Sequence, residues 1–101
     1  MKLKEIEIPK EALSKLCERR HIYKLAFFGS VLREDFTDAS DLDLLVEFEP
    51  DHRIGLIGMA GIEAELSELL GRKVDLRTPG ELSRYFRQNV LATAKTIYAR
   101  G

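Results

Sequence analysis

The segment YKLAFFGSVLREDFTDASDLDLLVEF, residues 23–48, decides the fold of this chain. A nearly continuous apolar run over residues 24–28 ends at Gly29 and Ser30, ten residues follow, and a second, largely apolar run then extends to Phe48. Continuous apolar runs of this kind are typical of strands that are covered on both faces. Because a parallel crossover usually needs a dozen or more residues, we expect the two strands to be antiparallel neighbours.

Two acidic residues, Asp41 and Asp43, open the second of these strands. Side chains two positions apart on a strand point to the same face, so we expect both carboxylates on one face of the sheet. In an antiparallel pair, the end of the first strand lies beside the start of the second. The carboxylates and the Gly29-Ser30 turn are therefore expected to lie together at one end of the strand pair.

The Gly29-Ser30 turn is a candidate anion cradle. It follows a strand and precedes an expected short helical turn, where free backbone N–H groups can point at an anion. Glycine also allows a ligand to approach the backbone closely. Mg²⁺ is usually held by one or two carboxylates together with the phosphates of a substrate. Carboxylates beside an anion cradle thus predict a metal-bound nucleotide as the ligand.

Helical segments are expected before and after this strand pair in the sequence. Residues 9–20 have apolar side chains at the helical period, with Pro9 at the first helical position. Residues 55–70 have apolar side chains three or four apart, and Gly71 follows as a helix terminator. About two dozen residues separate the second strand from a third at 73–77, which is enough for a helical crossover. The second and third strands are therefore expected to be parallel.

The C-terminal region is also expected to be helical. Thr78 and Glu81 form a capping-box pattern that would open it. Apolar and aromatic residues follow on one helical face and beside it and are expected to pack onto the sheet, although the two tyrosines could instead protrude toward a partner: Tyr85, Phe86, Val90, Leu91, Ala94, Ile97 and Tyr98. The predicted fold class is α/β (α+β), with a small mixed three-stranded sheet flanked by helices in the order α-β-α-β-α-β-α.

Length and composition limit the remaining possibilities. A chain of 101 residues is expected to form one domain over residues 1–101, and 45% hydrophobic with 33% charged residues favours a folded globular protein. A net charge of −1 argues against extended binding of nucleic acid. The single cysteine, Cys17, is expected in the core. Without an apolar stretch of membrane-spanning length, we expect a cytoplasmic protein with no membrane association.

The arrangement Gly-Ser, ten residues, Asp-x-Asp and a further Asp on a later strand resembles the signature of the DNA polymerase beta-like nucleotidyltransferase superfamily. The later residue here is Asp75, in Lys73-Val74-Asp75-Leu76. The short length and the tail LSRYFR over residues 82–87 are similar to the minimal nucleotidyltransferases, which are often encoded beside HEPN proteins as the antitoxin of a toxin–antitoxin pair. The resemblance extends from Leu25 to the C-terminus.

This resemblance implies a two-metal site for nucleotidyl transfer. Asp41 and Asp43 would bridge two Mg²⁺ or Mn²⁺ ions, and Asp75 would hold the catalytic ion and position or deprotonate the acceptor hydroxyl. Gly29 and Ser30 would bind the phosphates of ATP. For this, the three carboxylates must face the same side of the sheet.

Other parts of the family pattern match less fully. The family often has Gly-Ser-Arg-x-Arg-Gly at the turn, whereas this chain has Val31 and Glu34 at the first Arg and last Gly positions. Only Arg33 therefore carries over as a phosphate-binding residue. Ser40, directly before Asp41, matches a Ser-Asp-x-Asp form of the motif and would orient a carboxylate.

The activity that the resemblance implies is transfer of AMP from ATP to a hydroxyl, a tyrosine, of a cognate HEPN toxin, with this chain as its antitoxin in a homo- or hetero-oligomer. Two alternatives stay open. The fold could act as a non-catalytic module that neutralises its toxin by contact alone. The acceptor could instead be a small molecule such as an aminoglycoside, although enzymes of that class usually carry an added substrate-binding domain.

Overall fold

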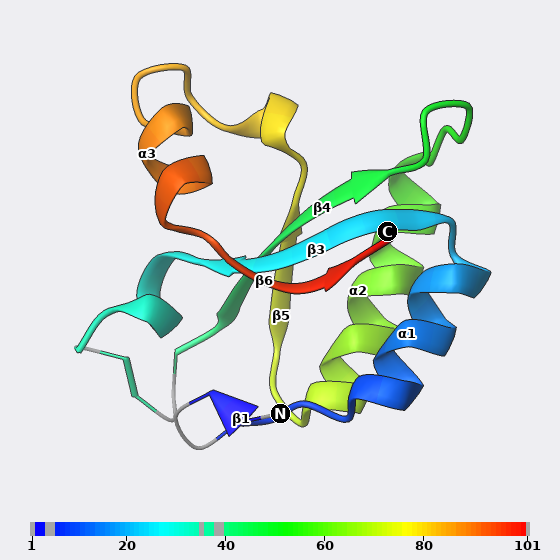
Figure 1. Ribbon diagram of the computed structural model, residues 1–101, viewed down its shortest axis with the longest axis horizontal. Helices are drawn as coiled ribbons and strands as arrows, with labels where there is room; N and C mark the ends of the chain where they lie inside the picture. The colour runs from blue at the N-terminus through cyan, green and yellow to red at the C-terminus, as the bar shows by residue number, and fades with distance from the viewer. Residues whose placement is uncertain (1, 4–5, 35, 38–39, 101) are drawn as a thin grey trace.

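The structure is a computed structural model that describes residues 2–3, 6–34, 36–37 and 40–100 (Figure 1). Its elements, in chain order, are β1 (Lys2–Leu3), β2 (Ile6–Glu7), α1 (Lys10–Arg19), β3 (Ile22–Phe28), the 3₁₀ helix η1 (Gly29–Leu32), β4 (Leu42–Phe48), α2 (Leu56–Leu70), β5 (Val74–Arg77), the 3₁₀ helix η2 (Pro79–Glu81), α3 (Arg87–Thr93) and β6 (Lys95–Ala99).

The central sheet has four strands in the order β5-β4-β3-β6, and β1 and β2 form a separate antiparallel pair. Strands β3 and β4 are antiparallel, with Phe28 opposite Asp43. Strands β4 and β5 are parallel, with Asp43 opposite Asp75. Both relations confirm the predicted strand directions. The predicted short helical turn between β3 and β4 is also confirmed, as η1.

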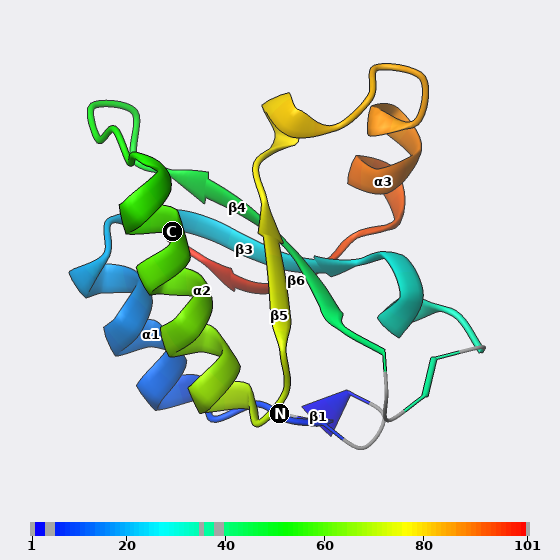
Figure 2. The same ribbon diagram turned by 180° about the vertical axis from the view of Figure 1, so that it is seen from behind.

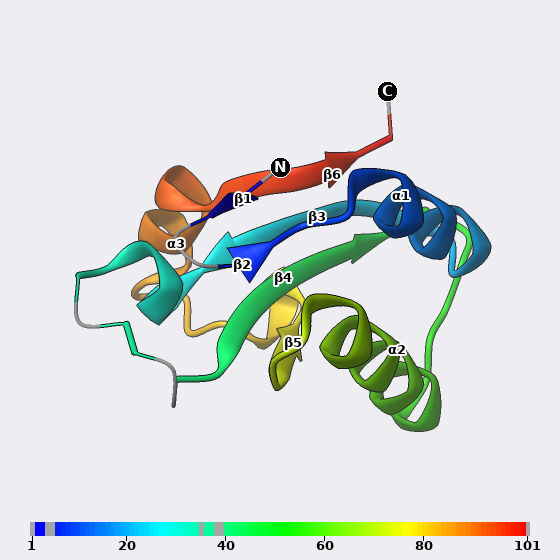
Figure 3. The ribbon, with the colours of Figure 1, turned by 90° about the horizontal axis from the view of Figure 1, so that it is seen from below.

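The helices lie on two sides of this sheet. Helices α1 and α2 run side by side against one side, whereas η2 and α3 stand on the other (Figures 1 and 2). The view from below shows β6, β3, β4 and β5 in order across the sheet, with α1 and α2 in front (Figure 3). Among the described helices, none is long and apolar enough to cross a membrane.

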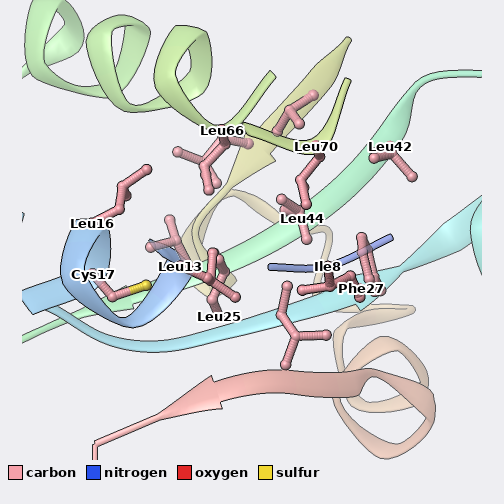
Figure 4. Close-up of a cluster of buried hydrophobic side chains, with 14 of the residues drawn as sticks. Ile8, Leu13, Leu16, Cys17, Leu25, Phe27, Leu42, Leu44, Leu66 and Leu70 are labelled. Carbon is pink, nitrogen blue, oxygen red and sulfur yellow. The ribbon is translucent and has the colours of Figure 1, made fainter. Parts of the chain in front are cut away.

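The hydrophobic core lies between the sheet and the pair of helices α1 and α2. Its side chains come from elements that are far apart in the sequence, and Figure 4 shows them pointing toward one another: Ile8, Leu13, Leu16, Cys17, Leu25, Phe27, Leu42, Leu44, Leu66 and Leu70. Residues Leu42 and Leu44 on β4 point into this core, so Asp43 between them faces the opposite side. The core thus fixes the direction in which the candidate carboxylate points.

Strand β5 is tied to α2 along its outer edge. The backbone N–H of Val74 donates to the hydroxyl of Ser67 at 2.9 Å, and that of Leu76 donates to the carboxylate of Glu63 at 2.8 Å. Both donors are outward-pointing groups of an edge strand, which would otherwise be free to pair with another chain. These bonds hold Asp75, between the two donors, at a fixed register beside β4.

Cys17 is fully buried, as predicted. Burial, with a smaller contribution from the charge of Glu18, raises the pKa of its thiol to about 12. At pH 8, only about one thiol in ten thousand would then be ionised. We therefore expect Cys17 to resist a thiol reagent such as iodoacetamide in the native chain and to react fully in 6 M guanidinium, which mass spectrometry can measure. Rapid labelling of the native chain would contradict this environment.

The C-terminal region differs from the prediction. Helix α3 ends at Thr93, and residues 95–99 form β6, which pairs with β3. The predicted helix was wrong here because Thr96, Ile97 and Tyr98 are β-branched or aromatic and favour a strand. Pairing along β3 also removes an open sheet edge. The central sheet consequently has four strands instead of the predicted three, and Ile97 reaches the core from a strand.

The expected packing of the C-terminal side chains onto the sheet is also partly wrong. Tyr85 is 89% exposed, and Phe86 and Leu91 are about half exposed. Tyr85 and Phe86 lie before α3 begins at Arg87, so the helix does not turn them toward the sheet, and only Leu91 of the three belongs to it. At the other end of the chain, Pro9 precedes the first residue of α1 instead of beginning the helix.

Candidate active site

The strand register brings Asp43 and Asp75 to one side of the sheet. Residues directly opposite each other on neighbouring strands point to the same face, and the parallel β4/β5 register pairs these two residues. Asp41 lies two residues before Asp43, just outside β4, and its charge and that of Asp75 both act on Asp43. The shared orientation of Asp43 and Asp75 on which the predicted site depends is therefore present.

Asp43 lies in an environment that disfavours its negative charge. Burial is the largest cause of a pKa above the ordinary value for aspartate, and the like charges of Asp75 and Asp41 raise this pKa further. A backbone hydrogen bond from Ser30 and the charge of Arg33 oppose the rise. A bound cation would relieve this concentration of negative charge. The oxygen-only donor set fits a hard divalent ion such as Mg²⁺.

Gly29 makes room for Asp43. Its φ is +73°, in the left-handed region that favours glycine, and it directly follows β3. A Cβ added at this position would lie 2.4 Å from Oδ2 of Asp43, so a larger residue here would force the turn or the carboxylate to move. The sequence pattern indicated a glycine that allows close approach of a ligand, and the structure shows the approach of a carboxylate from the neighbouring strand.

Ser30 contacts both Asp43 and Asp41. Its backbone N–H donates to Asp43, and its hydroxyl lies 3.4 Å from the carbonyl oxygen of Asp41. The N–H that we predicted to hold a phosphate therefore has an acceptor within the chain. Ser40, in contrast, bonds Thr37 through its hydroxyl, at 3.1 Å to the backbone nitrogen and 3.2 Å to the side-chain oxygen. This geometry does not support the predicted bond from Ser40 to a carboxylate.

Two of the carboxylates have cationic neighbours. Asp75 contacts Arg77, with both nitrogen–oxygen distances at 3.3 Å, and Oδ2 of Asp41 lies 4.0 Å from Nζ of Lys73. Over the part of the chain that the structure describes, no group of three or more acidic, histidine or cysteine side chains closes around a common metal position. Binding of a metal ion by all three carboxylates would therefore require side-chain movement, with Arg77 and Lys73 giving way.

A hollow of about 560 Å³ opens beside the Gly29 turn. One wall comes from η1 and the residue after it, and the other from α3 and the start of β6; the lining is Gly29, Leu32, Arg33, Asn89, Val90, Thr93 and Lys95. The two predicted phosphate-binding residues Gly29 and Arg33 therefore share a hollow of the size that ligands occupy in proteins.

Sequence reasoning missed the contribution of α3 to this hollow. Asn89 and Thr93 lie four residues apart on one face of the helix, and Lys95 follows on β6. The sequence pattern predicts apolar packing for this region and tyrosines that could meet a partner, but no ligand contact from Asn89 or Thr93. The polar face formed by the two residues four apart was the available signal, but nothing in the sequence placed that face opposite Gly29.

Comparison with known proteins identifies the class of this chain. Residues 9–97 match the family model described as the nucleotidyltransferase domain, and the chain belongs to this family. A protein of Methanocaldococcus jannaschii, provisionally named protein adenylyltransferase MJ1217, is 38% identical over 85 residues, which cover 79% of this chain and 84% of that protein. Protein adenylyltransferase MntA of Thermococcus cleftensis is 36% identical over 90 residues, 88% of this chain and 89% of the relative.

Solved structures agree with this classification. The structure of a provisionally named minimal nucleotidyltransferase is 38% identical, with a TM-score of 0.68 over 84% of this chain and 85% of that chain. A chain in the structure of the tri-AMPylated Shewanella oneidensis HEPN toxin in complex with MNT antitoxin has a TM-score of 0.62 over 90% of this chain and 70% of its own length. At 20% identity, the latter likeness shows a shared fold. The chain is thus a minimal nucleotidyltransferase, as its sequence pattern predicted.

Proposed function

We propose that this chain transfers AMP from ATP to a tyrosine hydroxyl of a cognate HEPN toxin and so acts as its antitoxin. The observation that carries the proposal is the direct pairing of Asp43 with Asp75 beside the Gly29 turn, within a chain of the nucleotidyltransferase family. The names of relatives as protein adenylyltransferases favour a protein acceptor. The fold that it shares with a chain of the HEPN–MNT complex favours a toxin of that class.

In this proposal the carboxylates serve different steps. Asp41, Asp43 and Asp75 would hold one or two Mg²⁺ ions, which supply neutralisation of charge on the attacking and leaving oxygens. Asp75, on the edge strand, accepts the proton of the acceptor hydroxyl. The hydroxyl oxygen forms a bond to the α-phosphorus of ATP, the bond from that phosphorus to the bridging oxygen breaks, and pyrophosphate leaves.

The hollow beside the Gly29 turn is the proposed position of the triphosphate. Arg33 and Lys95 line it from opposite walls and would supply positive charge to the phosphate oxygens. The positive φ of Gly29 keeps the turn close to Asp43, so phosphates in this hollow would lie next to the carboxylate that is to share their metal ion.

The direct test is incubation of the purified chain with labelled ATP, Mg²⁺ and the HEPN protein encoded beside it. We expect an added mass of one or more AMP units on a tyrosine of the HEPN protein, located by peptide mass spectrometry, together with loss of toxicity. If the chain neutralises the toxin without forming any adduct, and if its Asp43→Asn variant neutralises the toxin equally well, the chain would instead be the non-catalytic binding module. An adduct on a small molecule would replace the proposed acceptor.

A further inference from the structure

A second hollow, of about 610 Å³, lies on the far side of the carboxylates from the Gly29 turn, along the outer edge of β5. Its walls are the start of α2 with the loop before it, the end of β4, and the segment from β5 to η2. Asp75 lies in this lining, whereas Gly29 and Arg33 line the other hollow. One hollow therefore includes the candidate carboxylate Asp75, and the other includes Gly29, which lies against Asp43.

The rim of this second hollow is apolar and unusually exposed. Leu56, which lines it, is 90% exposed, and Ile57, the next residue of α2 and outside the lining, is 91% exposed. Large aliphatic side chains side by side at such exposure are typical of a surface that a partner covers. Phe48, Ile54 and Met59 continue the apolar wall inward from this rim. We refer to Leu56 and Ile57 as the α2 corner.

The charges around the hollow indicate the class of partner. Its lining contains three acidic residues, Glu63, Asp75 and Glu81, against one basic residue, Arg77. An excess of negative charge repels the phosphates of a polynucleotide. A small hydrophilic molecule in the hollow would leave Ile57, which lies outside the lining, exposed. The combination of an apolar rim and an acidic floor fits a protein segment that inserts an aromatic side chain carrying a hydroxyl.

We propose that this hollow is the acceptor-side docking site, in which the α2 corner binds the partner protein and the hydroxyl-bearing side chain enters toward Asp75. The inference rests on the proposed function. Donor and acceptor then approach the carboxylates from opposite ends, so the acceptor oxygen meets the α-phosphorus on the side away from the departing pyrophosphate. Asp75 is the carboxylate common to the acceptor hollow and the metal site.

The test uses the single variants Leu56→Glu and Ile57→Glu. These positions are the first two of α2, where a negative charge favours the helix, so both variants are expected to fold. Calorimetric titration with the HEPN protein is expected to show affinity lowered about tenfold or more. In the transfer assay, the KM for that protein should rise similarly, while binding of ATP with Mg²⁺ stays unchanged because the other hollow is intact.

Two controls separate docking from general damage. Ala12→Glu adds the same charge at an exposed position of α1, beside Leu69 near the far end of α2, and should leave affinity unchanged. Leu56→Met keeps an apolar side chain and should retain near-normal affinity. Normal HEPN binding by both glutamate variants would overturn the docking site, even if wild-type transfer occurs. Weakened binding without any transfer by the wild type would retain the docking site and refute the proposed activity. Transfer of AMP to RNA or to an aminoglycoside instead of to the HEPN protein would also overturn the proposed docking site.

Discussion

Replacing Asp43 with asparagine is expected to lower the rate of AMP transfer about 1,000-fold, because the loss of one metal-binding carboxylate removes several kcal/mol of transition-state stabilisation. The same change is expected to raise the melting temperature. Asp43 is partly buried beside two like charges, and its pKa is above the ordinary value, so its ionised form is disfavoured in the folded state. Asparagine has nearly the same shape without the charge. Transfer assays and calorimetry measure the two effects.

The pH dependence of stability has a definite sign. A carboxyl group whose pKa is higher in the folded chain destabilises the fold fully above its folded pKa, and this penalty disappears as the pH falls toward the pKa of the unfolded chain. The stabilising effect of Asp43→Asn should therefore be largest at neutral pH and vanish in acid. Asp51→Asn, the same change in an exposed turn, should alter neither the rate of AMP transfer nor the melting temperature. Near-normal transfer by Asp43→Asn would contradict the role of Asp43 in AMP transfer. A lowered melting temperature would contradict the destabilising effect of its charge.

Gly29→Ala is expected to lower transfer about 100-fold, since displacing a catalytic group by about 1 Å can cost this much. The added methyl group would overlap Oδ2 of Asp43, so either the turn or the carboxylate must move. The fold should also lose about 1–3 kcal/mol, because alanine is strained at a positive φ. Denaturant unfolding and steady-state transfer assays would measure both losses.

Gly71→Ala is the matched control for this change. Gly71 has nearly the same φ, +71°, at the end of α2, but a Cβ there would meet nothing within 4 Å. It should cost about 1 kcal/mol of stability from backbone strain alone and leave transfer intact. Equal losses of activity in the two variants would mean that strain, and not contact with Asp43, explains the requirement for glycine.

Much of the fold and the candidate site followed from local patterns. The apolar run before Gly29, the ten-residue connection and the Asp-x-Asp spacing predicted an antiparallel pair that the structure confirms. The length of the segment between β4 and β5 predicted their parallel pairing, which in turn places Asp75 opposite Asp43. These predictions succeeded because strand periodicity and connection length leave few alternatives.

The remaining features depend on tertiary contacts that no local pattern contains. The residues after Thr93 pair with β3, and the stretch from Val90 to Ile97 also fits a helical spacing, so the sequence was ambiguous. The contacts of Ser30 with Asp43, of Arg77 with Asp75, and of Ser40 with Thr37 depend on side-chain positions within the fold. The hollow that joins Arg33 to Lys95 requires α3 to lie across from η1, which only the three-dimensional arrangement reveals.

The order in which the strands meet has a consequence for biosynthesis. Strand β3, which leads into the Gly29 turn, lies between β4 and β6, and its partner β6 is formed by residues 95–99. A ribosome releases all three aspartates before it makes that last strand. Until residues 95–99 emerge, the edge of β3 that pairs with β6 has no partner, so the nascent chain carries the candidate carboxylates on an incomplete sheet. We therefore expect transfer activity to begin only after residues 95–99 have emerged and paired with β3.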